Sequence, residues 1–150
     1  MTHLKKGDVA PQINSINQNG EKVNLDTLKG KKVILYFYPK DMTPGCTLQS
    51  CNLRDNYNLL IESGYIVLGC SADSPARHLK FIDKYDLPFD LISDEEKEVL
   101  NDYGVWGLKK FMGKEYHGIN RTTFVIDEDG IIDDVITKVK TKNHTQQIVD

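Results

Sequence analysis

Residues 33–53 read VILYFYPKDMTPGCTLQSCNL, and the order of structural elements expected in these residues indicates the class of fold. It begins with a continuous apolar run at 33–38, rich in β-branched and aromatic residues, which is typical of a central strand buried on both faces. Pro39 ends that run, and a turn with a second proline follows it. From 44 to 63 the apolar residues recur at helical spacing, and Gly64 is placed to cap the helix. The stretch therefore predicts a strand, a turn and a helix in that order.

The rest of the chain continues this alternation of strands and helices. We expect a hairpin in the first 25 residues, a strand at 65–69, a helix from Ser74-Pro75 to about Tyr85, a short helix from the cap at 93–96 to about Tyr103, a hairpin made by 122–126 and 131–137, and a final helix from Asn143. Residues 104–120 are interpreted as a long loop whose aromatic side chains fold onto the core. The pattern predicts an α/β fold: a mixed central sheet flanked by helices on both faces, with an N-terminal β-hairpin. A thioredoxin-like sandwich is the most economical arrangement.

Length and composition indicate one globular domain that spans residues 1–150. Hydrophobic residues make up 39% of the chain and charged residues 27%, and no apolar run approaches the roughly 20 residues that cross a bilayer. The first residues lack the features of a secretory signal, so we expect a cytoplasmic protein. The 19 basic and 22 acidic residues give a net charge of −3 without a basic stripe, which argues against nucleic acid and membranes as partners.

The chain has three cysteines, and two of them, Cys46 and Cys51, lie five residues apart in the expected helix. On a regular helix this separation places their Cα atoms roughly 8 to 9 Å apart. A disulfide requires Cα atoms within about 7 Å of each other. Either the helix is misassigned, or a bond between these cysteines forms only when the segment unwinds.

A metal site and a reactive thiol are the other uses of such a pair. A structural zinc site needs four ligands, but His3, His78, His117 and His144 are scattered singly, so we expect no metal and no cofactor. Cys46 would instead lie in the first turn of a helix, where free backbone N–H groups and the positive end of the helix dipole stabilise a thiolate. The residues therefore favour a reactive thiol.

Pro39, Thr43 and Cys46 form the motif P-x-x-x-T-x-x-C within FYPKDMTPGCT, and here the chain resembles the peroxiredoxins. The resemblance extends over nearly the whole chain, including GDVAPQ near the start, VLGCSADSP at 67–75 and GVWGLKKFMGKEYHGINRTTFVID at 104–127. A second cysteine five residues after the first is the mark of the peroxiredoxin Q subgroup, also called the bacterioferritin comigratory protein subgroup.

The resemblance implies a thiol-dependent peroxidase that reduces hydrogen peroxide and organic hydroperoxides in antioxidant defence. Cys46 resembles the peroxidatic cysteine, which becomes a sulfenic acid, and Cys51 resembles the resolving cysteine, which forms a disulfide with it. Thioredoxin or a related dithiol donor would then reduce that disulfide. The subgroup also suggests a monomer.

The resemblance assigns supporting roles to three further residues. Thr43 would donate a hydrogen bond to the thiolate and orient the peroxide, Pro39 would shield the site, and Arg121 would stabilise the thiolate and the charge on the breaking O–O bond. Without the resemblance, Thr43 could be a simple helix cap and Arg121 a surface charge at the start of a strand. Many peroxiredoxins carry Glu where this chain has Gln49, so the arginine could be positioned differently.

Two alternatives remain open from the sequence. Cys70 ends an apolar run and is expected to be a buried, inert residue, with an alternative resolving cysteine as the second interpretation. A Cys46–Cys51 disulfide could also serve a thiol-switch redox sensor that changes a partner surface without repeated turnover. Turnover is the better hypothesis, because Thr43 and Arg121 are useful for O–O cleavage and unnecessary for a switch.

Overall fold

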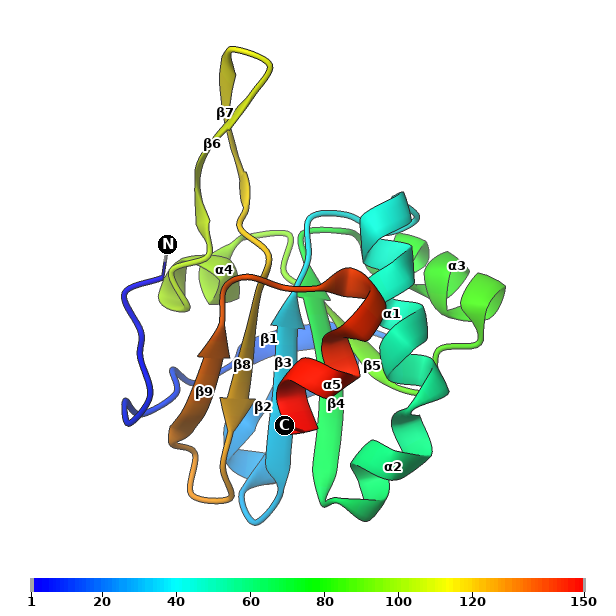
Figure 1. Ribbon diagram of the computed structural model, residues 1–150, viewed down its shortest axis with the longest axis vertical. Helices are drawn as coiled ribbons and strands as arrows, with labels where there is room; N and C mark the ends of the chain where they lie inside the picture. The colour runs from blue at the N-terminus through cyan, green and yellow to red at the C-terminus, as the bar shows by residue number, and fades with distance from the viewer. Residues whose placement is uncertain (1, 150) are drawn as a thin grey trace.

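The computed structural model describes residues 2–149, which form one seven-stranded sheet, a separate two-stranded hairpin and helices packed around the sheet (Figure 1). The strands are β1 (Asn14–Asn17), β2 (Lys22–Asn24), β3 (Lys32–Phe37), β4 (Tyr65–Ser71), β5 (Asp90–Ser93), β6 (Trp106–Phe111), β7 (Lys114–Ile119), β8 (Thr122–Ile126) and β9 (Ile132–Ile136). The helices are α1 (Pro44–Asp55), α2 (Tyr57–Glu62), α3 (Pro75–Tyr85), α4 (Glu98–Asp102) and α5 (His144–Val149), and short 3-10 turns cover Leu25–Leu28 and Thr141–Asn143. None of these helices is long and apolar enough to span a membrane.

The large sheet is mixed, with the strand order β2-β1-β5-β4-β3-β8-β9. Its centre is parallel, because β4 runs parallel to both β3 and β5. The outer strands are antiparallel: β8 and β9 extend one side as a hairpin, and β1 and β2 extend the other. Both predicted hairpins are therefore confirmed.

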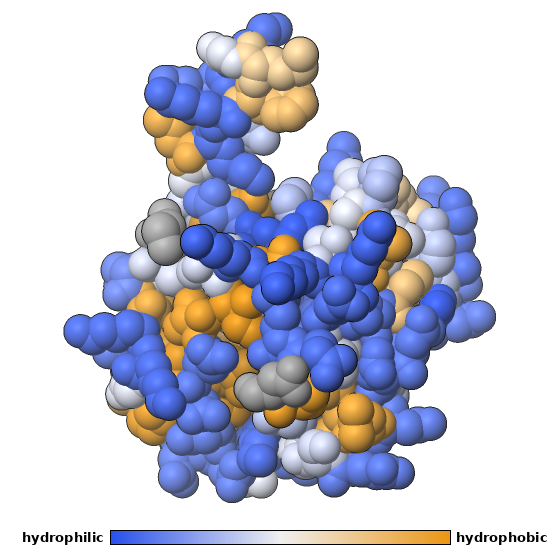
Figure 2. Space-filling view, viewed as in Figure 1, coloured by the Kyte–Doolittle hydropathy of each residue, from blue (hydrophilic) through white to orange (hydrophobic). Residues whose placement is uncertain are grey.

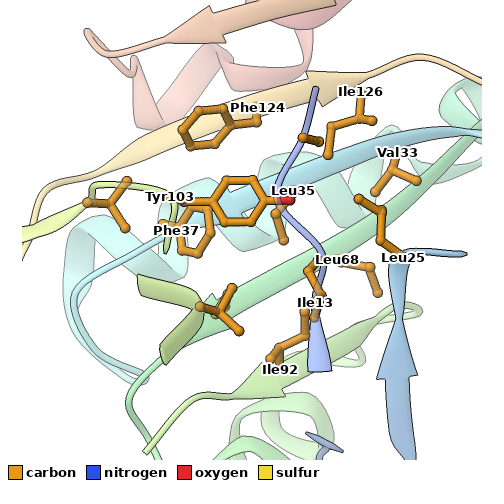
Figure 3. Packing of buried hydrophobic residues seen from close by; sticks show 14 of the residues in the cluster. Ile13, Leu25, Val33, Leu35, Phe37, Leu68, Ile92, Tyr103, Phe124 and Ile126 are labelled. Carbon is orange, nitrogen blue, oxygen red and sulfur yellow. The ribbon is translucent and has the colours of Figure 1, made fainter. Parts of the chain in front are cut away.

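Strand β3 is buried on both faces, as its apolar run predicts. Val33, Leu35 and Phe37 pack on one face with residues of β5, β8 and α4, as Figure 3 shows around Phe37, Tyr103 and Phe124. On the other face, Ile34, Tyr36 and Tyr38 pack against residues of α1, α2, α3 and α5. Helices thus cover both faces of a mixed sheet, and the predicted α/β architecture is confirmed.

The single helix expected from 44 to 63 is instead two helices, α1 and α2, which meet at Asn56. The backbone N–H and the side-chain Nδ2 of Asn56 both donate to the Asn52 carbonyl, at 3.3 and 2.8 Å. Asparagine side chains compete in this way with the regular helical hydrogen bonds. The break therefore has a local cause that apolar spacing does not reveal.

The helix expected to start at the cap in 93–96 is also placed differently. Ser93 is the last residue of β5, a strand that the sequence analysis missed, and α4 begins only at Glu98. Asp94 still acts as a cap, because its Oδ2 accepts from the backbone N–H of Leu100 at 2.7 Å. A buried strand of four residues is too short to show an alternation of apolar and polar side chains, so the sequence shows only the acidic helix cap that follows it.

The prediction of a long loop at 104–120 is wrong. The segment forms the hairpin of β6 and β7, which stands away from the body of the molecule (Figure 1). Met112 and Gly113 have φ angles of 51° and 80°, as a tight two-residue hairpin turn requires. Phe111 and Met112 are 67% and 88% exposed and form the apolar tip seen in Figure 2, so these side chains do not fold onto the core. Trp106, at the base of the hairpin, does pack against it.

Candidate active site

Cys46 lies in the first turn of α1, directly after the loop that leaves β3. Thr43 occupies the N-cap position, Pro44 is the first helical residue and Cys46 is the third, with a fully buried side chain. Proline suits the first helical position because its missing N–H would have no partner there. The free N–H groups of this turn and the helix dipole favour a negative charge on the sulfur. The sequence therefore positions the thiol as predicted.

Arg121, between β7 and β8, is the cation of the site. Its Nη2 donates to Cys46 Sγ at 3.3 Å and its Nη1 donates to Gln49 Oε1 at 2.6 Å. A Cβ atom on Gly45 would lie 3.2 Å from Nη2, so the glycine allows the guanidinium to approach the helix closely. A cation at this distance stabilises a thiolate. The structure thus brings together two residues that the sequence separates by 75 positions.

Gln49 is buried completely and holds Arg121 through a neutral amide. Its Nε2 has no hydrogen-bond partner among the residues that the structure describes. A carboxylate at this position would neutralise part of the guanidinium charge. The amide fixes the arginine and leaves its full charge available to the Cys46 sulfur.

Thr43 and Pro39 flank the cysteine along the chain. The Thr43 hydroxyl donates to the Lys40 carbonyl at 2.7 Å and makes no capping hydrogen bond to the helix. With its one proton directed at Lys40, this hydroxyl does not donate to Cys46, which differs from the expected contact with the thiolate. Its lone pairs remain able to accept a hydrogen bond. Pro39 follows β3 as the second residue of the connection to α1 and is partly buried.

Cys51 lies on the same unbroken helix as Cys46, and both are free thiols. Its side chain is partly exposed, and burial raises the pKa of the Cys51 thiol while Arg54 lowers it in part. Because the helix is regular, the two Cα atoms are roughly 8 to 9 Å apart, beyond the reach of a disulfide. A bond between them requires α1 to unwind.

The second half of α1 is anchored by residues that sequence reasoning did not find. The Ser50 hydroxyl lies 2.9 Å from the buried Tyr36 hydroxyl. Asn52 Nδ2 donates to the Lys142 carbonyl at 2.9 Å, and its Oδ1 accepts from the Thr145 N–H at 2.8 Å. These contacts join α1 to β3 and to the C-terminal segment. The sequence gives no signal of them, because the partners are far apart along the chain.

Lys109, on the projecting hairpin, adds a second cation that the sequence analysis also missed. Burial and the neighbouring Arg121 lower the pKa of Lys109, while Cys46 opposes that shift. Its Nζ donates to the Ile119 carbonyl at 2.9 Å. Lys109 therefore adds a positive charge whose electrostatic influence reaches Cys46.

Cys70 is buried near the end of β4. Burial raises its pKa well above the ordinary value, and the nearby Asp94 raises it further. The prediction of a buried cysteine is confirmed, and its surroundings disfavour a thiolate.

One group of side chains in residues 2–149 has the composition of a metal site. Ligand atoms of Asp41, Asp73 and His78 lie within 4.8 Å of one another, and all three residues are buried. Their oxygen and nitrogen atoms already bond to one another and to neighbouring donors and acceptors. The group is a closed hydrogen-bond network, and its partners are described below.

A buried cysteine at a helix N-terminus with an arginine against its sulfur, on a thioredoxin-like α/β fold, defines the class of thiol-dependent peroxidases. The model of the AhpC/TSA family matches residues 6–135, and the chain belongs to this family of peroxiredoxins. It is 49% identical to Peroxiredoxin Bcp of Escherichia coli over 150 residues, which cover 100% of this chain and 96% of the relative.

Solved structures of relatives share the fold. Peroxidoxin BcpB from Mycobacterium tuberculosis matches with a TM-score of 0.85 at 33% identity, covering 97% of this chain and 94% of that one. The Xanthomonas campestris bacterioferritin comigratory protein matches with a TM-score of 0.87 at 28% identity, covering 99% and 94%. The protein is thus a peroxidase that acts on peroxides with a thiol reductant, as the sequence predicts.

Proposed function

We propose that Cys46 is the peroxidatic nucleophile, that Cys51 resolves its oxidised form through an intramolecular disulfide, and that thioredoxin or a related dithiol recycles the enzyme. The observation that carries this proposal is the 3.3 Å contact between Arg121 Nη2 and Cys46 Sγ. Among the three cysteines, Cys46 alone combines a helix N-terminus with such a cation in the part of the chain that the structure describes.

In the first step the Cys46 thiolate attacks one oxygen of the peroxide, and the O–O bond breaks. The sulfur is oxidised to a sulfenic acid, and the other oxygen takes up a proton and leaves as water or an alcohol. Arg121 stabilises the charge that develops on the separating oxygens. The Thr43 hydroxyl donates its own proton to the Lys40 carbonyl. Its oxygen therefore accepts a hydrogen bond from the O–H group of the peroxide.

Pro39 and the aromatic residues beside it limit the access of water to this step. The apolar run of β3 ends at Tyr38, which is completely buried, and Pro39 is the next residue. The substrates we propose are hydrogen peroxide and organic hydroperoxides. The Xanthomonas campestris relative supports the second group, since its structure is described as giving insight into its alkyl peroxide reduction activity.

In the second step the Cys51 sulfur attacks the Cys46 sulfenic acid, a disulfide forms and water leaves. Because both cysteines lie on one helix, this step follows local unwinding of α1. In the third step a dithiol reduces the disulfide by exchange and becomes oxidised itself. An enzyme that depends on such a reductant suits a reducing compartment, so we place it in the cytoplasm, as a monomer built on one domain.

The test compares the native chain with Cys51→Ser in a coupled assay that contains thioredoxin, thioredoxin reductase and NADPH. The native protein should consume many equivalents of peroxide, and mass spectrometry of the oxidised protein should show Cys46 linked to Cys51. Cys51→Ser should consume one equivalent and lose recycling. A native protein that also stops after one equivalent would favour the thiol-switch sensor, and unchanged recycling in the variant would assign resolution to Cys70 or to a second molecule.

A further inference from the structure

The loop between β3 and α1 contains a buried carboxylate. Asp41 is 1% exposed, whereas Lys40 and Met42 on either side of it are exposed. A buried charge is costly unless it is paired and hydrogen-bonded. The partners of Asp41 therefore show what this loop is built to hold.

Every polar group of Asp41 is bound. Its carboxylate accepts from the Tyr38 hydroxyl at 2.5 Å and pairs with His78 Nδ1 at 2.6 Å. Its backbone N–H donates to Asp73 Oδ2 at 2.8 Å, and Arg77 Nη2 donates to its carbonyl at 3.3 Å. Three of these partners come from α3 and the segment before it, so the loop is attached to that side of the molecule.

His78 is fully buried and fixed at both nitrogens. Its Nε2 lies 2.9 Å from the Ile92 carbonyl on β5, and because a carbonyl only accepts, Nε2 carries a proton. Its Nδ1 lies 2.6 Å from Asp41 Oδ2, so a hydrogen bond also joins the imidazole to the carboxylate. Two buried acids, Asp41 and Asp73, thus face two bases, His78 and Arg77. The network is balanced in charge.

This network lies next to the reactive turn along the chain. Asp41 precedes the N-cap Thr43 by two residues, and Met42 between them has a φ angle of 68°. A side chain in this left-handed region is strained and persists only where its surroundings fix it. The Asp41 contacts fix one end of the connection, and the first turn of α1 fixes the other. With Asp41 held by these contacts, the chain that enters α1 has little freedom at Thr43, and the first turn of the helix starts from a fixed residue.

We propose that the Asp41–His78 pair is a positioning device for the reaction. It holds the first turn of α1 wound, with Cys46 beside Arg121, against the unwinding that a Cys46–Cys51 disulfide needs. The pair thereby sets the balance between peroxide attack and disulfide formation. The proposal rests on the proposed roles of Cys46 and Cys51. His78 touches no reacting atom and acts through Asp41.

The experiment measures both steps separately by rapid quench after mixing with hydrogen peroxide. Loss of the Cys46 thiol gives the rate of attack, and mass spectrometry of the Cys46–Cys51 disulfide gives the rate of resolution. In His78→Leu and in Asp41→Asn, attack should slow by about tenfold and resolution should accelerate by about tenfold. In the double variant the effects should be smaller than the product of the single effects, because both substitutions remove one contact.

Val99→Ala on α4 is the matched control for a general loss of stability. Val99 is buried in the core on the opposite face of the sheet, so its truncation should lower the melting temperature while both rates stay within about twofold. If the His78 and Asp41 variants lower the melting temperature in the same way and leave the ratio of the two rates unchanged, the pair is merely structural and the proposal is wrong. Should His78→Leu fail to fold, the isosteric Asp41→Asn decides the question.

The outcomes also separate this proposal from the one on which it rests. A native protein that forms no Cys46–Cys51 bond overturns the proposed function, and the positioning role with it. If the native protein forms the Cys46–Cys51 bond, and the His78 and Asp41 variants keep the native ratio of the attack rate to the resolution rate, only the positioning role is overturned.

Discussion

Two completely buried cysteines, Cys46 and Cys70, have neighbours of opposite charge, and we propose that this difference, and not burial, decides which thiol reacts. Cys46 begins a helix and contacts the Arg121 guanidinium, while Cys70 lies in the central strand β4, where burial and Asp94 raise its pKa. The two residues are close in the fold, since Cys70 pairs with Phe37 of the strand that leads to Cys46. The helix end and the sign of the neighbouring charge therefore make the difference.

The strongest test of this comparison is to remove each sulfur in turn, beginning with Cys46→Ser. Peroxidase turnover should fall by roughly a thousandfold or more, because neither Cys51 nor Cys70 combines a helix N-terminus with a contacting guanidinium in the described residues. A coupled assay that follows NADPH consumption measures the loss. Turnover that survives in this variant would remove Cys46 from its assigned role.

Arg121→Ala should have the next largest effect, because it makes the surroundings of Cys46 more like those of Cys70. We expect the rate of peroxide attack to fall by about a hundredfold, since one preorganised cationic donor is lost. Stopped-flow kinetics of the first reaction with peroxide measures this rate. The control is Arg54→Ala at the other end of α1, where the arginine donates to the Tyr85 carbonyl and does not contact Cys46. An equal loss in both variants would contradict a specific role for Arg121.

Gln49→Leu should have a smaller effect, because it leaves the guanidinium in place and removes only the acceptor that orients it. The expected decrease in the rate of attack is about fivefold, which corresponds to roughly 1 kcal/mol for one hydrogen bond. The comparison variant is Gln146→Leu, an exposed amide on α5 that should leave the rate unchanged. If Gln49→Leu leaves the rate of attack unchanged, the 2.6 Å contact does not position the arginine.

Cys70→Ala should have the smallest effect of the series. Turnover and recycling should stay within about twofold of the native values, because the thiolate of a buried cysteine beside a carboxylate is strongly disfavoured. The measurement is the coupled assay together with the disulfide map of the oxidised protein. Loss of recycling in this variant would make Cys70 the resolving cysteine.

Much of this comparison could be predicted from the sequence, because the signals that define it are local. The apolar run of β3, the proline at the start of α1 and the position of Cys46 are encoded by neighbouring residues, and the structure has them as expected. Arg121 was identified only by the resemblance to peroxiredoxins. Residue spacing alone favoured a surface charge, since no local pattern connects position 121 with position 46.

The features that the sequence did not predict depend on contacts between distant residues. The hairpin of β6 and β7 has few apolar contacts and a Met-Gly turn without a typical hairpin signature, so it resembled a loop. His78 was interpreted as an isolated histidine, because its partners Asp41 and Ile92 are far from it in the chain. The break at Asn56 depends on one side chain that competes for a carbonyl.

The placement of Cys46 and Cys51 on one helix also has a consequence for how the proposed reaction cycle responds to temperature. Unfolding steps have large activation enthalpies, and their rates change about three- to sixfold for every 10 °C. Disulfide formation requires α1 to unwind, whereas peroxide attack does not. Cooling should therefore slow disulfide formation more steeply than peroxide attack. At low temperature the form with Cys46 as a sulfenic acid should therefore accumulate during turnover. At higher temperature the Cys46–Cys51 disulfide should accumulate until the dithiol reduces it.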